Sequence, residues 1–273
     1  MITMNDIGLN GRLGNQMFQY AALLGIAKKN NFDYGINYSN DFNLDLEEIP
    51  KDIHMNQNIL SLSRLFKLSA QDSSDKNFPT IVEPHFNFCK ELFQINDNIN
   101  LHGYFQTAKY FEHIENEILK EYDFPNHIKQ KAEANIDAIK DKEIVGVHFR
   151  RSDYLILKDF YNTNLEDYYQ KAFKLFSDKK YIFLLFSDDV NYLNENFSDK
   201  KNFKICNFGN QFVELAMMSI CDHNIIANSS FSWWGAWLNQ NKNKKVVAPA
   251  VWFNHSYKDK ESKDIYCDGW IKL

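Results

Sequence analysis

Residues Ile144–Asp153 read Ile-Val-Gly-Val-His-Phe-Arg-Arg-Ser-Asp, an apolar run that ends in charged and polar side chains. Its first part, Ile144–Phe149, is typical of a buried strand. A helical pattern over Leu165–Phe176 and a strongly apolar strand at Tyr181–Phe186 come next. A strand, a helix and a further strand in this order predict parallel strands joined by a crossover helix.

The same alternation continues toward the C-terminus. Further strands are expected at Phe203–Cys206, Asn224–Ala227 and Val246–Ala248, and further helices at Asn191–Asn196, Phe212–Cys221 and Trp233–Asn239. Repeated alternation of this kind indicates an α/β fold with a parallel sheet.

The N-terminal half gives a weaker pattern. A poor strand at Ile2–Leu9, a turn at Asn10–Asn15 and a helix up to Lys29 are followed by a strand at Tyr34–Tyr38. Residues 40–98 are polar and irregular; beyond them we expect a strand at Leu101–Phe105 and helices at Ala108–Glu121 and Ile128–Lys140. The charged stretch Lys140–Glu143 marks the expected boundary between an N-terminal domain, 1–140, and a C-terminal domain, 141–273.

Composition narrows the class of protein. The chain has 273 residues, a formal net charge of −5 and no long Lys/Arg block, so nucleic acid is not an expected partner. Its four cysteines form no C-x-x-C pair, which argues against a zinc site and fits a reducing compartment. No signal peptide or apolar run of membrane-spanning length is evident. We therefore expect a cytoplasmic protein without a transmembrane segment, either soluble or peripheral at the cytoplasmic face of the membrane.

Polar clusters follow the expected strands at equivalent points. Arg150–Asp153 comes after Phe149, Ser187–Asp189 after Phe186, and Asn228–Ser230 after Ala227. Ligands of parallel α/β sheets bind at the carboxyl ends of the strands. The candidate site is therefore expected where these clusters meet.

The chemistry of these residues suits an anionic ligand. Adjacent arginines at a strand end can point to opposite sides, one toward a diphosphate and the other toward a structural partner. Serines at the start of a helix, as in Asn228–Ser232, can form a phosphate cradle with the free backbone N–H groups, although ordinary capping explains one of them. His148, taken alone, is more simply a buried core histidine. Asp188 and Asp189 are adjacent rather than spaced as D-x-D, so a contact to nucleotide is favoured over a metal site.

Several motifs together resemble the α-1,2-fucosyltransferase family, glycosyltransferase family 11, in its bacterial form. They occur in the family's order and cover the chain: Gly11–Ala21, Gly103–Gln106 with Lys109–Phe111, Val147–Tyr154, Phe186–Asp189, Asn228–Leu238 and Trp270–Ile271.

The resemblance implies a GT-B-like architecture, in which two Rossmann-like domains face a central cleft and the C-terminal one holds the donor. It implies inverting transfer of L-fucose from GDP-β-L-fucose to the 2-hydroxyl of a terminal β-galactoside, in a surface polysaccharide such as O-antigen or in an oligosaccharide. The N-terminal domain then lies on the acceptor side. No cofactor and no metal are expected, with GDP-fucose as the co-substrate.

The family's functional residues carry over by position. Arg150 matches the arginine that grips the β-phosphate, and His148 and Asp188 match residues on the guanine side. The whole expected donor site comprises His148, Arg150, Arg151, Asp188, Asn228, Ser229, Ser230, Phe231 and Ser232. The opening loop, Gly14, Asn15 and Gln16, is expected near the reacting sugar, with Asn15 approaching the phosphate.

The general base does not carry over, because Lys158 stands near the position of the glutamate found in more distant fucosyltransferases. Asp153 is the first choice and Asp159 the second, so the expected catalytic residues are Arg150, Asp153 and Asn15. Two alternatives stay open. One is a transferase of the same fold with another GDP-sugar or another linkage, and the other is a non-catalytic carbohydrate-binding protein.

Overall fold

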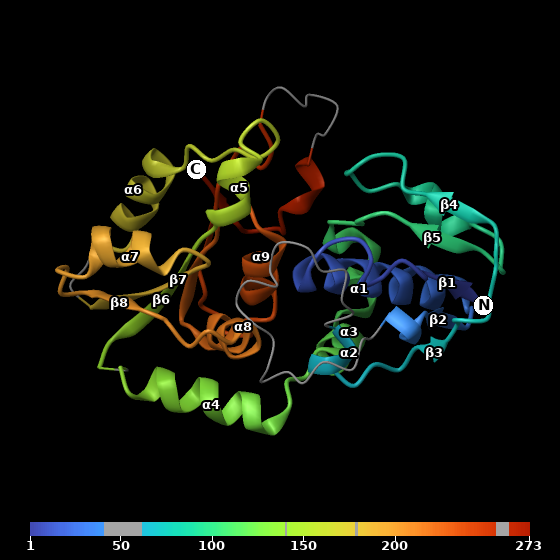
Figure 1. Ribbon diagram of the computed structural model, residues 1–273, viewed down its shortest axis with the longest axis horizontal. Coiled ribbons are helices and arrows are strands. Elements are labelled where there is room, and N and C mark those ends of the chain that lie inside the picture. The colour runs from blue at the N-terminus through green and yellow to red at the C-terminus, as the bar shows by residue number, and fades with distance from the viewer. Residues whose placement is uncertain (41–61, 140, 178–179, 255–261) are drawn as a thin grey trace. The chain divides into compact units, whose positions relative to one another are not determined.

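The computed structural model describes residues 1–40, 62–139, 141–177, 180–254 and 262–273. The chain divides into two compact units (Figure 1). Unit 1 comprises Met1–Phe124 and Asp259–Cys267, and unit 2 comprises Pro125–Lys258 and Asp268–Leu273.

The boundary differs from the one expected at residue 140. Helix α4 (Asn126–Asp137) packs on α8 (Gln211–Ile220) of unit 2, burying Ile128, Ala132 and Ile136. The division therefore falls before Pro125, because the apolar face of α4 belongs to the second core. The short return of the chain to unit 1 is held by Asp264, whose carboxylate accepts from Lys109 Nζ at 2.6 Å and from the Phe88 N–H at 3.0 Å.

Unit 1 is built on a five-stranded parallel sheet in the order β3-β2-β1-β5-β4. The strands are short: β1 Ile2–Thr3, β2 Tyr34–Ile36, β3 Gln71–Asp72, β4 Thr80–Val82 and β5 Asn100–His102. Its helices are α1 Leu13–Asn30, α2 Leu62–Leu65 and α3 Glu115–Glu121, with single 3₁₀ turns at Tyr38–Asn40, Lys90–Gln94, Ala108–Tyr110, Glu112–Ile114 and Lys263–Ile265.

Helix α1 forms the centre of this unit, and every residue from Leu13 to Ala27 except Asn15 is buried. Gly25 permits the closest approach, since a Cβ atom there would lie 2.0 Å from the Tyr110 carbonyl oxygen. The expected helix at Ala108–Glu121 is instead two 3₁₀ turns followed by α3, so that the chain bends to pack Tyr110, Phe111 and Ile114 inward.

Unit 2 carries a six-stranded parallel sheet in the order β11-β10-β9-β6-β7-β8. Its strands are β6 Glu143–Phe149, β7 Tyr181–Ser187, β8 Phe203–Ile205, β9 His223–Ile225, β10 Val246–Ala248 and β11 Ile271–Lys272. Besides α4 and α8, its helices are α5 Ser152–Ile156, α6 Glu166–Lys174, α7 Val190–Phe197 and α9 Ser230–Trp237. The α/β alternation expected after Asp141 is confirmed.

The two faces of this second sheet are covered by different helices, as Figure 1 shows. Val145, Val147 and Phe149 point to one face, where the apolar side chains of α6 and α7 complete a core. The alternate residues point the other way, toward α8 and α9. There a Cβ atom at Gly146 would lie 2.9 Å from Cys221 Sγ, just past the end of α8. His148 shares this second face and therefore lies on the α9 side of the sheet.

Within the described residues, no helix has both the length and the apolar character needed to cross a membrane.

Candidate functional site

The polar clusters predicted to meet do meet in unit 2. Strands β9, β6 and β7 are neighbours and parallel, so the residues that follow them share one edge of the sheet. Arg150 pairs with Asp188, which joins the first two clusters directly. The third cluster begins α9, where the Phe231 ring lies 5.8 Å from the ring of His148, near the end of β6.

Arg150 is the centre of this edge. Its Nη1 lies 2.9 Å from Asp188 Oδ2 and its Nη2 lies 2.5 Å from Asp153 Oδ1, and only 14% of the side chain is exposed. Burial alone would lower the pKa of Arg150, but the adjacent carboxylates of Asp188 and Asp153 help to hold that pKa above its ordinary value. The guanidinium is thus a fixed cation with a planar fork, the group best suited to a phosphate.

Arg151 has a different role from its neighbour. Its Nε donates to Asp189 Oδ2 at 3.2 Å, and its guanidinium carbon lies 3.6 Å from the centre of the Tyr192 ring. Asp189 also caps α7 by accepting from the Tyr192 N–H at 3.0 Å. Arg151 is therefore the arginine of the pair that takes a structural partner. The expected place of Arg151 in the donor site stays a prediction.

Both oxygens of Asp188 are engaged. Oδ2 pairs with Arg150, and Oδ1 accepts from the Arg151 N–H at 2.9 Å. This carboxylate therefore aims Arg150 and ties the end of β6 to that of β7. Its expected contact with guanine stays a prediction.

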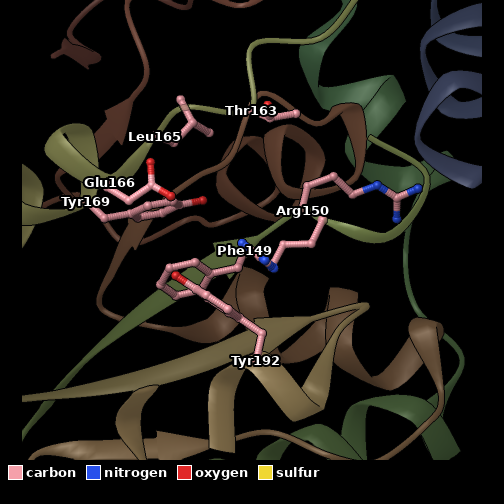
Figure 2. Close-up of a pocket in the computed structure, with 8 residues that line it drawn as sticks. Phe149, Arg150, Thr163, Leu165, Glu166, Tyr169 and Tyr192 are labelled. Atoms are coloured by element: carbon pink, nitrogen blue, oxygen red, sulfur yellow. The ribbon is translucent and has the colours of Figure 1, made fainter. Parts of the chain in front are cut away.

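A pocket lies at the same edge of the sheet (Figure 2). It is lined by Phe149, Arg150, Arg151, Thr163, Leu165, Glu166, Tyr169 and Tyr192. In Figure 2 the Arg150 guanidinium points away from Tyr169 and Tyr192, consistent with its pairing to Asp153 and Asp188. The lining thus combines aromatic rings with the Arg151 guanidinium, which lies over Tyr192, and with the acid Glu166.

His148 is buried and electrically neutral. Burial, followed by the nearby charge of Arg150, lowers its pKa to about 3. Its backbone carbonyl accepts from the Tyr169 hydroxyl at 2.7 Å, but its Nδ1 has no hydrogen-bond partner among the described residues. A buried ring nitrogen without a partner is costly in a folded protein, so Nδ1 is a candidate for ligand contact.

His148 should make the protein less stable in mild acid. Its pKa is about 3 when folded and 6.5 ordinarily, so the unfolded chain binds more protons between these values. Its contribution to stability is therefore full above pH 6.5 and is lost as the pH falls toward 3. Between pH 6.5 and 5, the unfolding free energy should drop by about 1.6 kcal/mol more in the wild type than in His148→Gln. Urea titrations at both pH values measure this difference, and a variant of an exposed histidine, His127→Gln, is the control. Equal decreases in unfolding free energy in wild type and His148→Gln would contradict the lowered pKa of His148.

The segment Asn228–Ser232 forms the start of α9. Asn228 is fully buried, and its Nδ2 donates to the carbonyls of Asn162 at 3.0 Å and Trp252 at 2.8 Å. Its Oδ1 has no partner among the residues that the structure describes. Ser229 occupies the N-cap position without a side-chain cap, so it does not satisfy the first N–H groups of the helix. The Ser232 hydroxyl donates to the Ser229 carbonyl at 3.3 Å. Half-buried Ser230 and Phe231 are therefore the more accessible residues of this segment.

The opening loop lies in unit 1 and is only partly available. Gly14 and Gln16 are buried, and the Gln16 amide donates to the Gly11 carbonyl and accepts from the Leu62 N–H, both at 3.2 Å. These contacts shape the loop, and the expected place of Gly14 and Gln16 near the reacting sugar stays a prediction. Half-buried Asn15 remains the candidate, and its Oδ1 accepts from Gln106 Nε2 at 2.7 Å. Gln106 belongs to a motif noticed in the sequence, but the pattern gave no hint of this contact.

The structure weakens the case for Asp153 as general base. Its carboxylate is held by Arg150, and an acceptor hydroxyl would have to compete with that guanidinium. Asp159 is exposed.

Comparison with known proteins defines the class. The model of Glycosyl transferase family 11 matches residues 1–273, and the chain belongs to that family. The expected resemblance to family 11 is thereby confirmed.

The similar proteins found by sequence are also glycosyltransferases. An α-1,2-colitosyltransferase of Escherichia coli is 30% identical, over 97% of each chain. The O-antigen biosynthesis glycosyltransferase WbnK of Escherichia coli is 29% identical, over 97% of this chain and 99% of the relative. The galactoside 2-α-L-fucosyltransferase SEC1 of Bos taurus is 25% identical, over 85% of this chain and 63% of the relative.

Among solved structures, fucosyltransferase NodZ from Bradyrhizobium superposes with a TM-score of 0.54 over 86% of this chain and 91% of NodZ, at 14% identity. At that identity the likeness shows the shared fold alone. The GT-B-like α/β fold, built from two Rossmann-like units, is confirmed.

Proposed function

We propose that this family 11 enzyme transfers L-fucose from GDP-β-L-fucose to the 2-hydroxyl of a terminal β-galactoside, with inversion at the sugar's anomeric carbon. The single observation that carries the proposal is the buried guanidinium of Arg150, aimed by two carboxylates at the sheet edge where ligands of this fold bind. The α-1,2 linkage is supported by the names of the colitosyl- and fucosyltransferase relatives.

The reaction is a single displacement. The acceptor oxygen forms a bond to C1 while the bond from C1 to the β-phosphate oxygen breaks, and GDP leaves with the bonding electrons. The hydroxyl proton passes to a base. Negative charge grows on the departing diphosphate, so preorganised donors aimed at it accelerate the step. Arg150 and the uncapped N-terminus of α9 are the groups of unit 2 suited to this task.

Orphaned polar atoms at the same edge suit the rest of the donor. His148 Nδ1 and Asn228 Oδ1 are buried without partners among the described residues. Neutral histidine nitrogen and amide oxygen can pair with hydroxyl or N–H groups of a nucleotide or sugar. We assign both to donor binding.

Colitose is the second candidate sugar, because the relative that is 30% identical is a colitosyltransferase. Colitose lacks one hydroxyl that fucose carries. A site built to hydrogen-bond that hydroxyl rejects the analogue without it by roughly 10⁴–10⁵, whereas a site indifferent to it discriminates weakly.

A donor panel tests the proposal. Purified protein is incubated with lactose as acceptor and GDP-fucose, GDP-mannose or GDP-activated colitose as donor, and both GDP release and the linkage of the product are measured. We expect the highest kcat/KM with GDP-fucose and an α-1,2-linked product. Preference for colitose would replace the sugar but keep the reaction, whereas a different linkage would overturn the proposal. Glycan binding without GDP-sugar binding or turnover would favour a non-catalytic carbohydrate-binding protein.

Turnover should not depend on a divalent metal. Asp188 and Asp189 are the adjacent acids that a metal site at this edge would use, and their carboxylates are engaged by Arg150, by Arg151 and by the N-terminus of α7. A metal bound by this pair would have to displace those contacts. We expect the same initial rate in EDTA as in Mn²⁺ or Mg²⁺. Loss of activity in EDTA that Mn²⁺ restores would reassign the aspartates as ligands.

A further inference from the structure

Glu83 lies directly after β4, at the carboxyl end of this edge strand of unit 1. Its backbone N–H donates to the His102 carbonyl at 2.7 Å, which fastens it to the end of β5. Its side-chain Oε2 accepts from the N–H groups of Tyr104 at 2.8 Å and Phe105 at 3.0 Å. The carboxylate thus closes the turn that follows β5.

That turn needs support from outside its own sequence. Phe105 has a φ of +52°, a left-handed conformation that is unfavourable for a bulky residue. Gly103 allows the close approach of Glu83, because a Cβ atom at Gly103 would lie 2.4 Å from the Cβ of Glu83. On the other side, Gln19 Nε2 donates to the Gly103 carbonyl at 2.9 Å. Strained backbone of this kind persists where surrounding contacts over-determine it.

The turn leads directly to Asn15. Gln106 is the next residue after Phe105, and its Nε2 donates to Asn15 Oδ1 at 2.7 Å. The position of Gln106 is further limited by the Thr107 N–H, which donates to the Phe105 carbonyl at 2.7 Å. Glu83 is therefore linked to Asn15 through the turn, from which its carboxylate accepts two hydrogen bonds, and through Gln106, which donates one to Asn15.

We propose that Glu83 is a positioning residue, whose carboxylate holds the Gly103–Phe105 turn and thereby sets the orientation of Gln106 and Asn15. The inference rests on the proposed function in one respect, the assignment of Asn15 to the reacting sugar. It adds to the reaction a residue that no motif contains.

The environment of Glu83 agrees with such a role. Burial raises its pKa to about 7, against the opposing effect of the two N–H donors and of His85. Its Oε1 is buried and has no hydrogen-bond partner among the described residues. The fold thus keeps a buried carboxylate with one unpartnered oxygen at this position while Oε2 supports the turn. The uncharged amide oxygen of a glutamine could accept hydrogen bonds from the same two N–H groups.

The proposal predicts different effects for the glutamine and alanine variants of Glu83. Glu83→Gln keeps an acceptor for the Tyr104 and Phe105 N–H groups, whereas Glu83→Ala removes it. Because a misplacement of about 1 Å can cost roughly 10²-fold in rate, we expect kcat to fall about 10²-fold in Glu83→Ala and to stay within about tenfold of wild type in Glu83→Gln. GDP affinity by calorimetry should be unchanged in both variants. Exposed Glu112→Ala, also in unit 1, is the matched control. An equal loss in the two Glu83 variants would overturn the proposal. It would mean that the reaction requires the carboxylate itself, as a proton acceptor, and not only an oxygen that supports the turn.

A double-mutant cycle identifies the route. If Glu83 acts through Asn15, Glu83→Ala should lower kcat little further in an Asn15→Ala background. Independent, multiplying losses would overturn the proposal. An Asn15→Ala enzyme with full turnover would instead refute the part assigned to Asn15 in the proposed function.

Hydrogen exchange provides a readout that does not need turnover. In Glu83→Ala, amide exchange should accelerate in peptides covering 103–106 and also in those covering 11–16, while Glu83→Gln should resemble wild type. Faster exchange at 103–106 with unchanged exchange at 11–16 would show that the contact chain does not reach Asn15, and would overturn the inference even if the donor were misidentified.

Discussion

Arg150→Lys should lower kcat by roughly 10²–10³-fold although the positive charge is kept. Two nitrogens of the Arg150 guanidinium contact two different carboxylates, Asp188 at 2.9 Å and Asp153 at 2.5 Å. A planar fork held in this way can still present an N–H edge to phosphate oxygens. A lysine ammonium is a point charge on a flexible stem, and it cannot keep both carboxylates and reach a diphosphate in the same geometry.

The measurement is the steady-state rate of transfer from GDP-fucose to lactose at varied donor concentration, together with the melting temperature of the variant. Arg64→Lys, on α2 of unit 1, controls for the change of side chain. The loss should appear in kcat more than in donor KM, because charge on the leaving diphosphate grows in the transition state. A folded Arg150→Lys protein with near-normal turnover would show that Arg150 is not the diphosphate clamp.

Asp188→Ala should also reduce turnover at saturating donor, by about 10²-fold. Both oxygens of this carboxylate are engaged, one by Arg150 Nη1 and the other by the Arg151 N–H. Alanine releases the guanidinium on one side and removes the acceptor of the Arg151 N–H. Because water can reach this N–H, we expect stability to fall by only about 0.5–1.5 kcal/mol for the lost hydrogen bond. Asp188→Asn can keep the hydrogen bond to Arg151, so it should recover stability more fully than turnover.

Calorimetry with GDP and UDP separates this aiming role from the guanine contact expected on the sequence. If Asp188 aims Arg150, the variant should lose kcat, and it should lose affinity for both nucleotides to a similar extent. If Asp188 reads the base, kcat should survive at saturating donor while GDP loses its advantage over UDP. Exposed Asp199→Ala is the control for removing an aspartate from unit 2. The second result would restore the guanine contact and refute the aiming role.

The second unit was predictable because its signal is local. Strand β6 has the seven-residue span Glu143–Phe149, and β7, at Tyr181–Ser187, is buried over six residues. Apolar runs of this length between amphipathic helices leave few alternatives. The expected strand ends lie within two residues of the observed ones, whereas α9 begins three residues before its expected start. The edge strand β11, at Ile271–Lys272, was not expected, since two residues carry no periodic signal.

The first unit was harder for a physical reason. Its strands span two or three residues each, and Gln71–Asp72 and Thr80–Val82 are mostly exposed. Short exposed strands are held by their neighbours in the sheet rather than by their own burial pattern. The irregular appearance of residues 40–98 therefore concealed β3, β4 and Glu83, and residues 41–61 lie outside the described part of the chain.

By itself, the sequence determined the family, the α/β class and the sheet edge where the polar clusters gather, because motif order and strand-end position are properties of the linear chain. Only the tertiary structure decided how each side chain there is used. Adjacent Arg150 and Arg151 take different partners, because successive residues at a strand end point to opposite sides and meet different neighbours. Glu83 reaches the turn before Gln106 only because β4 and β5 are paired. Spacing along the chain cannot encode such a contact, since it depends on which strands become neighbours when the sheet forms.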